Sequence, residues 1–267
     1  MNITKHENSN KGNSPALGGI AASGFPVFEA SQGIDKGTYV FEGFEHASPT
    51  AATGAAGGLH YLIDSSSSID VQDKPGGVIR LTTASGDNNA ICTGSGASGF
   101  CEIDGTVAKR KRFFFEARLK TSAIAATDLF VGLVVPRTSA LISSSGTLAS
   151  GKFVGFHLTK DGVLKSKVSD ASTTTALTLT PSVVNDTYVK FLIQFDEGPA
   201  DSGQLTFAVN GEKVAVYADV NNALTELGAG GALKDSPLAG VVEVLGDAGT
   251  VNVDIDHIAI GYAGGDV

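Results

Sequence analysis

The second half of the sequence, from Arg112 to Tyr262, is a series of short runs in which apolar and polar residues alternate. This period of two is typical of β-strands that bury one face and expose the other. Glycine, asparagine and aspartate separate the runs, and these residues favour tight turns. The pattern extends upstream to Thr38. Strands are expected over residues 38–45, 59–63, 77–83, 89–93, 98–103, 113–120, 129–136, 152–159, 163–168, 176–180, 188–196, 204–209, 212–216, 241–245 and 251–261.

Strands separated by turns about every 8–12 residues predict an all-β fold, a two-sheet antiparallel jelly-roll sandwich. Two turns carry a hairpin signature, because the Asp161–Gly162 and Asn210–Gly211 pairs tolerate positive φ. Residues 89–93 and 98–103 are expected to form another hairpin around a turn rich in glycine and serine. A helix is expected only as a single turn over residues 223–227.

The composition narrows the classes of protein to which the chain can belong. With 42% hydrophobic and 18% charged residues, the chain is globular, and its 267 residues suit a single sandwich domain. A net charge of -9 argues against nucleic-acid binding, which needs clustered cations. The N-terminus lacks the apolar core of a secretion signal, and no apolar run is long enough to span a membrane. We therefore expect a protein made in a cytoplasm that binds neither nucleic acid nor membrane.

The N-terminal segment of the chain differs in composition from the rest. Residues 1–37 are polar and then rich in glycine and alanine, without hydrophobic periodicity. Such a segment buries too little surface to offset its ordering entropy unless a partner holds it. We interpret residues 1–37 as an extended or flexible arm, or alternatively as a frayed tail without a role, and residues 38–267 as one β-sandwich domain.

The chain has two cysteines, Cys92 and Cys101, which are too few for a disulfide scaffold. No histidine or second cysteine pair completes a zinc site beside them. They fall on the two expected strands of the hairpin over residues 89–103. Two thiols on adjacent strands are the simpler interpretation, and a disulfide stays open if the protein meets oxidising conditions.

Hydrolysis of a glycoside needs two carboxyl groups on either side of the scissile bond. Alternate residues of a strand point the same way, so the candidates are Glu102 with Asp104 and Asp254 with Asp256. Neither pair has a third carboxylate nearby, and the chain has no tryptophan to stack against a sugar ring. The sequence therefore predicts no catalytic residue and no enzyme activity.

Asp254 and Asp256 could also supply oxygen ligands to calcium, as could the oxygen-rich tip over residues 87–89. The simpler interpretations are an exposed strand face for the two aspartates and a turn for the tip. No nucleophile elbow and no phosphate-binding glycine loop is present, although a Ser-His-Asp triad stays open. The histidines are scattered without ligand spacing, at His6, His46, His60, His157 and His257. We expect no metal and no cofactor.

The order of the strand runs resembles that of concanavalin A-like, laminin-G-like sandwiches. The resemblance spans residues 38–262 and is one of strand order more than of invariant residues. It rests on the runs FFEARLK (114–120), FVGL (130–133), VGFHL (154–158), KDGVL (160–164), YVKFLIQFD (188–196), LTFAVNGE (205–212) and VDIDHIAIG (253–261). The resemblance implies a rigid sandwich whose loops and arm make the contacts.

Within that fold, the N-terminal segment and the loops rich in alanine, serine, threonine and glycine resemble structural proteins of tailed bacteriophages. This resemblance implies a capsid decoration or cement protein located in the virion. Its partners would be the major capsid protein and neighbouring copies of itself in a homo-oligomer. The alternative is a lectin-like module that binds a glycan or a receptor. A lectin would need an aromatic platform, for which the candidates are Tyr39, Tyr61, Tyr188, Tyr217 and Tyr262, although packing within strands is the simpler role for each.

Overall fold

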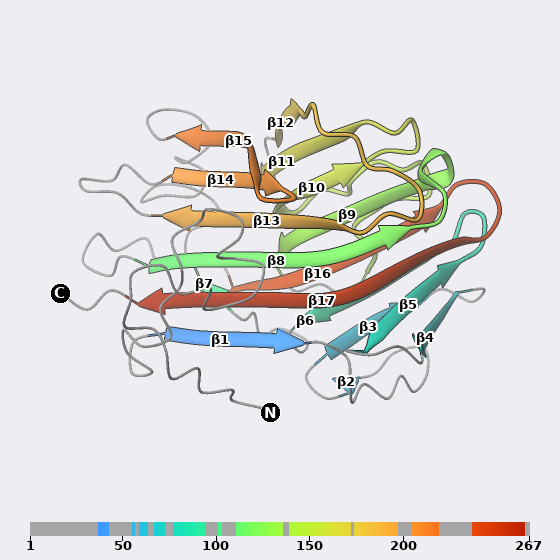
Figure 1. Cartoon of the computed structure of the whole chain (residues 1–267), viewed down its shortest axis with the longest axis horizontal. Coiled ribbons are helices and arrows are strands. Elements are labelled where there is room, and N and C mark those ends of the chain that lie inside the picture. Colours follow the sequence, from blue (N-terminus) through green and yellow to red (C-terminus); the bar gives the residue numbers. More distant parts are fainter. Residues whose placement is uncertain are drawn as a thin grey trace.

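The computed structural model has two antiparallel β-sheets packed face to face, so the predicted all-β sandwich is confirmed (Figure 1). The structure describes residues 37–42, 55–56, 59–63, 67–72, 77–93, 101–102, 111–135, 139–171, 174–196, 204–218 and 237–264. Among them the one helical segment is a short 3-10 turn at Ile124–Ala126, and no helix is long and apolar enough to cross a membrane. The predicted arm lies outside the described residues except for Gly37, and so does the helical turn expected over residues 223–227.

The eight-stranded sheet is built around its longest strands, β8 and β17 (Figure 1). One edge of β17 pairs with β8 along almost its whole length, whereas the other edge is shared by β5 and β1. In order across the sheet the strands are β15 (Glu212–Ala218), β14 (Gln204–Val209), β13 (Val189–Asp196), β8 (Lys111–Thr121), β17 (Val251–Gly264), β5 (Val78–Thr83) and β4 (Ser68–Gln72), with β1 (Gly37–Glu42) also on β17.

The nine-stranded sheet has β16 near its centre, paired with β9 on one edge and with β6 and β7 on the other. In order across the sheet the strands are β12 (Thr174–Thr178), β11 (Leu164–Asp170), β10 (Lys152–Leu158), β9 (Thr127–Val134), β16 (Pro237–Gly246), β6 (Asn88–Thr93), β3 (Leu59–Ile63) and β2 (Ala55–Ala56), with β7 (Cys101–Glu102) also on β16.

The expected hairpin over residues 89–103 is wrong. Strands β6 and β7 do not pair with each other, because both run antiparallel to β16, one after the other along the same strand. Cys92 lies opposite Val241 and Cys101 opposite Leu238. Three residues along a strand put the two backbones about 10 Å apart, since a strand rises about 3.3 Å per residue. That separation exceeds the Cα distance of a disulfide, so the register favours two separate cysteines.

Both turns with a hairpin signature are confirmed. Asn210 and Gly211 have φ of 51° and 86°, which is the geometry of a two-residue turn between β14 and β15. Gly162 has φ of 75° and donates its backbone N–H to the carbonyl of Thr159 over 2.8 Å, closing the turn between β10 and β11.

The alternation of apolar residues predicted most strands, but β2 and β4 were missed because two alanines and the run SIDVQ carry too little apolar signal.

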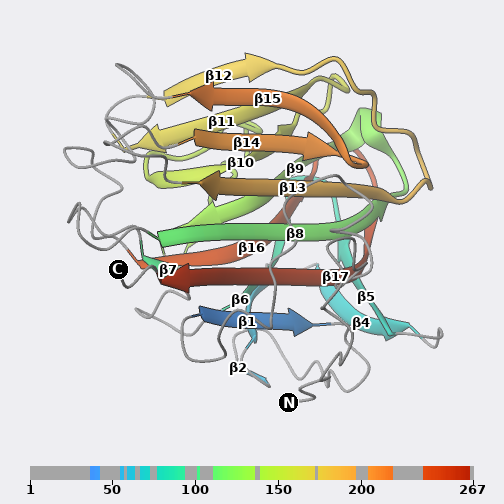
Figure 2. The ribbon, with the colours of Figure 1, turned by 60° about the vertical axis from the view of Figure 1, so that its left-hand side comes forward.

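A single apolar core fills the space between the two sheets. Phe156 of β10 packs against Phe191 and Phe207 of the eight-stranded sheet, with ring centroids 5.0 and 5.1 Å apart. At one end of the sandwich, the Tyr217 hydroxyl of β15 lies 2.8 Å from Ser166 Oγ of β11 and closes the gap between the sheets. Figure 2 shows that the edge strands β12 and β15 lie together at this end. The packing leaves each sheet with an outer face, turned away from the other sheet.

Candidate functional site

A loop covers part of the outer face of the nine-stranded sheet. Residues 139–151 precede β10, and within them Leu141 and Ile142 are fully buried. They pack on apolar side chains that point outward from the sheet, because strand alternation sends every second residue away from the main core. This second, smaller apolar cluster consists of Phe130, Val134, Leu141, Ile142, Phe153, Val241 and Leu245, with Leu148 at its margin. We call residues 139–151 the covering loop.

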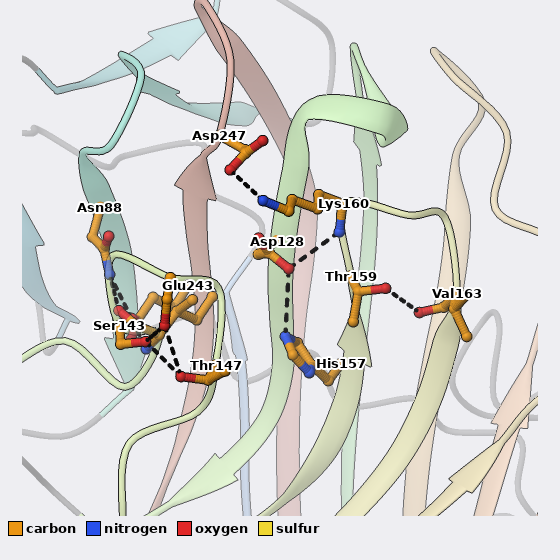
Figure 3. Close-up of polar contacts among 12 residues, drawn as sticks. Asn88, Asp128, Ser143, Thr147, His157, Thr159, Lys160, Val163, Glu243 and Asp247 are labelled. Atoms are coloured by element: carbon orange, nitrogen blue, oxygen red, sulfur yellow. Dashed lines mark hydrogen bonds and ion pairs between the residues drawn. The ribbon is translucent and has the colours of Figure 1, made fainter.

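Glu243 of β16 fastens the covering loop to the sheet (Figure 3). Its side chain is 1% exposed, and its carboxylate accepts the backbone N–H groups of Leu141 and Ile142 over 2.9 and 2.6 Å. Asn88 of β6 donates from Nδ2 to the same carboxylate over 3.2 Å and to the Ile142 carbonyl over 2.5 Å. Three N–H donors thus hold the buried carboxylate of Glu243, which acts as a structural anchor for the covering loop.

The tip of the covering loop is a tight turn that lies over Asp128. Gly146 has φ of 78° and donates its N–H to the Ser143 carbonyl over 2.8 Å. A Cβ added at Gly146 would overlap the Asp128 carboxylate, so the turn approaches the sheet as closely as its backbone allows. Ser143, Ser145 and Thr147 form a small cluster of hydroxyls on the exposed side of the tip, within 2.7–3.1 Å of one another.

Asp128 and His157 form a buried polar pair beneath this tip (Figure 3). Asp128 Oδ1 and His157 Nε2 are 3.9 Å apart, and the two side chains are 3% and 2% exposed. Burial, together with the nearby charges of Lys167 and Lys165, lowers the pKa of His157 to about 3, so its ring is neutral at neutral pH. Burial raises the pKa of Asp128. Among the described residues, Asp128 Oδ2 and both ring nitrogens of His157 have no hydrogen-bond partner.

Lys160 and Asp247 form the rim above this pair. The backbone N–H of Lys160 donates to Asp128 Oδ1 over 3.1 Å, and its ammonium group lies 2.9 Å from Asp247 Oδ1. The hydrogen bond to Asp247 raises the pKa of Lys160. Because Lys160 belongs to the β10–β11 turn and Asp247 follows β16, the rim joins two turns on either side of β9.

Two lysines extend the polar region toward the edge of the sheet. Lys165 and Lys167 are alternate residues of β11, so both point to the outer face, opposite His157 and Gly155 of β10. Both are half-buried. Burial and the charge of Lys165 lower the pKa of Lys167. No ion pair joins either lysine to an acidic side chain in the part of the chain that the structure describes. Within the described residues, Lys165 and Lys167 thus form a cationic pair without an ion-pair partner on the outer face.

Hydroxyl groups flank the cationic pair on its edge side. Ser169 of β11 accepts a hydrogen bond from Thr174 Oγ1 over 3.1 Å, and Thr178 stands opposite Lys165 on β12. Thr174 and Thr178 are exposed. We define the polar face as the region formed by Asp128, His157, Lys160, Lys165, Lys167, Ser169, Thr174, Thr178 and Asp247. Sequence reasoning missed it, except for naming His157 among scattered histidines.

The outer face of the eight-stranded sheet is organised differently. Asp254 of β17 is 2% exposed and receives Arg80 in a two-pronged contact of 2.6 and 2.9 Å, with the Lys120 ammonium group 3.6 Å away. A β-bulge in β17 between Ile255 and His257 displaces Asp256. Asp256 pairs with Arg118 at 2.8 Å. Both aspartates thus belong to a strand face, but the expectation that this face is exposed is wrong for Asp254, which is buried, and each aspartate is neutralised by a cation.

The rest of this face repeats the arrangement. Glu116 of β8 lies 3.0 Å from His257 Nε2 and 3.7 Å from the Lys190 ammonium group. Tyr188 stacks beneath Arg118, whose guanidinium carbon is 4.4 Å from the ring centroid. Its ring is therefore occupied by the protein's own cation. The other tyrosine with a described side chain, Tyr217, is 6% exposed in the core, as expected.

The remaining sequence candidates are not assembled into a site in the described residues. Glu102 belongs to β7, but its side chain and Asp104 lie outside the described set, as do His6 and His46. In the 87–89 tip, Asp87 closes a turn, whereas Asn88 and Asn89 begin β6. The side-chain amides of Asn88 and Asn89 donate hydrogen bonds to the backbone carbonyls of Ile142 and Ser68. No group of three histidine, cysteine, aspartate or glutamate side chains gathers as metal ligands within the described ranges. His157 has no hydrogen-bonded nucleophile there, so no triad is formed around it.

No protein-family model and no curated protein sequence matches the chain. Its fold, however, is similar to that of several solved structures. The carbohydrate recognition domain of Emp47p is 10% identical, with 85% of this chain and 97% of that chain covered and a TM-score of 0.56. Winged bean acidic lectin, solved with methyl-α-D-galactose, is 11% identical, with coverages of 86% and 100% and a TM-score of 0.51. A Shewanella oneidensis protein of unknown function is 14% identical, with coverages of 87% and 89% and a TM-score of 0.54. The chain therefore has a lectin-type, concanavalin A-like fold.

Proposed function

We propose that the chain is a lectin-like, non-catalytic recognition module that binds a saccharide on the polar face of its nine-stranded sheet. The observation that carries this proposal is the cationic pair Lys165 and Lys167. Both lysines are half-buried, and neither forms an ion pair with a described acidic side chain, although the chain carries a net charge of -9. Two like charges side by side repel each other, so the fold alone gains nothing from this pair. An anionic ligand would account for both lysines at these positions.

The chemistry of the polar face indicates the class of ligand. Two ammonium groups on neighbouring positions favour an anionic group, and charge-assisted hydrogen bonds are stronger than neutral ones. The exposed Thr174 and Thr178 supply hydroxyls that can exchange hydrogen bonds with a sugar, while the buried Ser169 accepts a hydrogen bond from Thr174. We therefore propose an acidic saccharide, with a carboxylate or sulfate at Lys165 and Lys167 and its hydroxyl groups along β12.

The solved structures with this fold support the proposal at the level of fold. The Emp47p domain is described as a carbohydrate recognition domain, and the winged bean lectin was solved with a bound galactoside. The non-catalytic part of the proposal is supported by the use of three of the four buried carboxylates among the described residues. Glu243 accepts backbone N–H groups, Asp254 is paired with Arg80, and Glu116 lies beside His257. Each of these carboxylates has a structural partner.

The hypothesis of a phage capsid decoration protein in the virion stays a prediction from the sequence. The fold is compatible with it, and no described contact bears on a capsid partner. A saccharide-binding module could also be carried on a virion, so the two hypotheses differ in what the polar face binds. Co-sedimentation with empty capsid shells is therefore run beside the saccharide test.

The test measures binding of the purified full chain to an array that contains acidic saccharides and their neutral parents. We expect retention of acidic saccharides, weakening as salt is raised because the contact is between charges. The double variant Lys165→Ala/Lys167→Ala should lower the affinity by roughly tenfold or more, as expected for losing charged hydrogen bonds. The matched control is Lys213→Ala, which removes an exposed lysine from β15 of the other sheet.

Two results would overturn the proposal. Binding of saccharides that is unaffected by the double variant would place the site elsewhere. Absence of saccharide binding, combined with binding to capsid shells that the double variant does not change, would favour the decoration hypothesis instead.

A further inference from the structure

Among the described strands, β12 has a neighbour on one side only, so it forms an edge of the nine-stranded sheet. Strand β12 pairs with β11 and ends the sheet on that side. Its residues are exposed apart from the half-buried Thr175, and Leu177 keeps 43% of its surface in solvent. An edge strand presents backbone N–H and C=O groups to any strand that can align with it, so folded proteins usually protect such edges with charge, proline or a bulge.

Of the four strands that end the two sheet orders, β15 and β4 carry such protection and β2 is very short, whereas β12 is neither protected nor short. Strand β15, at the end of the eight-stranded sheet, begins with Glu212 and Lys213, and its pairing with β14 is interrupted by a bulge between Phe207 and Ala208. Strand β4, at the opposite end, carries Asp70 in its centre. Strand β2 spans two residues. The sequence of β12, Thr-Thr-Ala-Leu-Thr, contains neither a charge nor a proline.

The hydrogen bonds of β12 show which backbone groups point outward. Leu179 donates its N–H to the Leu164 carbonyl over 2.9 Å, and the register continues with Leu177 opposite Ser166. Hydrogen-bonded and non-hydrogen-bonded pairs alternate along an antiparallel ladder. Leu177 and Thr175 therefore bond to β11, while the backbone groups of Thr174, Ala176 and Thr178 point away from the sheet.

We infer that β12 is the pairing surface for a second copy of this chain, which adds its own β12 antiparallel about a two-fold axis at Ala176. This register places Ala176 opposite its own counterpart and Thr174 opposite Thr178, so each outward backbone group meets a complementary one. In an isologous contact both copies use the same surface, which must therefore be self-complementary. The outward edge of β12 meets that condition.

The side chains fit the same register. Thr175 and Leu177 point toward the core side of the sheet, as does the buried Leu179, because they share its alternation. In the two-fold arrangement Leu177 stands opposite Thr175 of the second copy and loses its exposure to water. On the outer side only the small Ala176 and the hydroxyls of Thr174 and Thr178 meet, so no charge is brought into direct contact.

This pairing would join two nine-stranded sheets into one continuous surface. The two copies of Lys167 would then lie about 14 Å apart on the same outer face, three strand spacings of about 4.8 Å. If the polar face binds an acidic saccharide, as proposed above, one extended chain could reach both cationic pairs. The pairing itself does not depend on that function.

The test is the mass of the full chain in solution, measured by size-exclusion chromatography with light scattering over a range of concentrations. We expect a dimer. Ala176→Lys should shift the protein to a monomer, because the two-fold axis would face the new charges against each other. Ala176→Pro should do the same, since it removes an outward N–H and leaves the pairing with β11 intact. The control Val216→Lys places a charge on the exposed edge strand β15 and should leave the dimer unchanged.

A cross-link gives a second measurement. Hydrogen-bonded antiparallel pairs have Cα atoms about 5.5 Å apart, within the range of a disulfide. Ala176→Cys, in a chain with serine at positions 92 and 101, should form a disulfide-linked dimer on mild oxidation, while Thr180→Cys should not. A monomer at every concentration, or a dimer that survives both Ala176→Lys and Ala176→Pro, would overturn the inference. Saccharide binding is measured on the same variants. A variant that loses the dimer but still binds a single acidic sugar would show that the strand pairing and the proposed function are independent of each other.

Discussion

The outer faces of the two sheets handle charge in opposite ways. On the eight-stranded sheet, Asp254, Asp256 and Glu116 each lie beside a cation. On the nine-stranded sheet, His157 and Asp128 are buried with atoms that have no described partner, and Lys165 and Lys167 stand without a described counterion. A buried polar atom without a partner costs roughly 1–3 kcal/mol. The first face therefore balances its acids with cations of the same chain, whereas on the second face the half-buried Lys165 and Lys167 are available to a ligand.

The largest expected effect is on the anchor of the covering loop. Glu243→Ala removes a buried carboxylate and leaves the N–H groups of Leu141 and Ile142 without their acceptor. We expect the free energy of unfolding to fall by about 3–5 kcal/mol, measured by urea denaturation. The exposed Glu212→Ala on β15 is the control and should change it little. Equal effects of the two variants would mean that the loop is not held through Glu243.

The second effect concerns the pH dependence of stability. His157 has a pKa of about 3 in the folded protein and an ordinary value of 6.5, so between these values the unfolded chain binds a proton that the folded chain does not. The contribution of His157 is complete above about pH 6.5 and is lost as pH falls toward 3. The raised pKa of Asp128 acts with the opposite sign.

We therefore expect His157→Gln to flatten the acid side of the stability curve by up to about 1.4 kcal/mol per pH unit. Urea midpoints measured between about pH 4 and about pH 7 would show this, since most of that window lies between the folded and unfolded pKa values of His157. A variant whose curve runs parallel to that of the wild-type chain would show that His157 titrates normally and is not buried.

The third effect is on the neutralised face. Asp254→Ala leaves Arg80 and Lys120 without their carboxylate. Arg80 is 32% exposed, so water takes over much of its solvation, and we expect a loss of about 1–2 kcal/mol in the free energy of unfolding. Asp70→Ala on the neighbouring β4, where the carboxylate is exposed, should cost less. If Asp254→Ala and Asp70→Ala lower the free energy of unfolding equally, the face would be an ordinary solvated surface rather than a set of paired charges.

The smallest effect compares two glycines with nearly the same backbone. Gly146 and Gly249 have φ of 78° and 77°, so alanine is strained at both. Only at Gly146 would the added Cβ meet another atom, the Asp128 carboxylate. We expect Gly146→Ala to cost about 1 kcal/mol more than Gly249→Ala in thermal or urea unfolding. Equal costs would show that the tip of the covering loop does not rest on Asp128.

The sequence predicted the fold well because each strand carries its own signal. The run over residues 189–196 alternates apart from Leu192, and the Asn210–Gly211 pair dictates its turn locally. The hairpin over residues 89–103 was wrong because strand partners are chosen by the whole sheet, and β16 offers a longer edge than either short strand offers the other. Periodicity within a run holds no information about that choice.

The polar face could not be predicted, because its members come from separate turns and strands. Lys165 and Lys167 alternate on β11 like any solvated strand face, and only the register with His157 and the lack of an ion pair with a described acidic side chain distinguish them. Glu243 had a usable signal, a lone acid within the apolar run 241–245, but its partners in the covering loop lie about a hundred residues away. The pairing of Asp254 with Arg80 likewise depends on the sheet order.

The position of β17 also sets the order of events during synthesis. This last strand of the chain holds β8, β5 and β1 together, and the register of β1 begins with Gly37 opposite Ala263. A ribosome releases those partners more than two hundred residues apart, so β1 has no place to dock until β17 has been synthesised. Contacts so distant in sequence slow folding and leave strand edges uncovered meanwhile. The eight-stranded sheet is thus expected to close only after β17 has left the ribosome, and truncation just before Val251 should yield a chain that aggregates rather than a smaller folded domain.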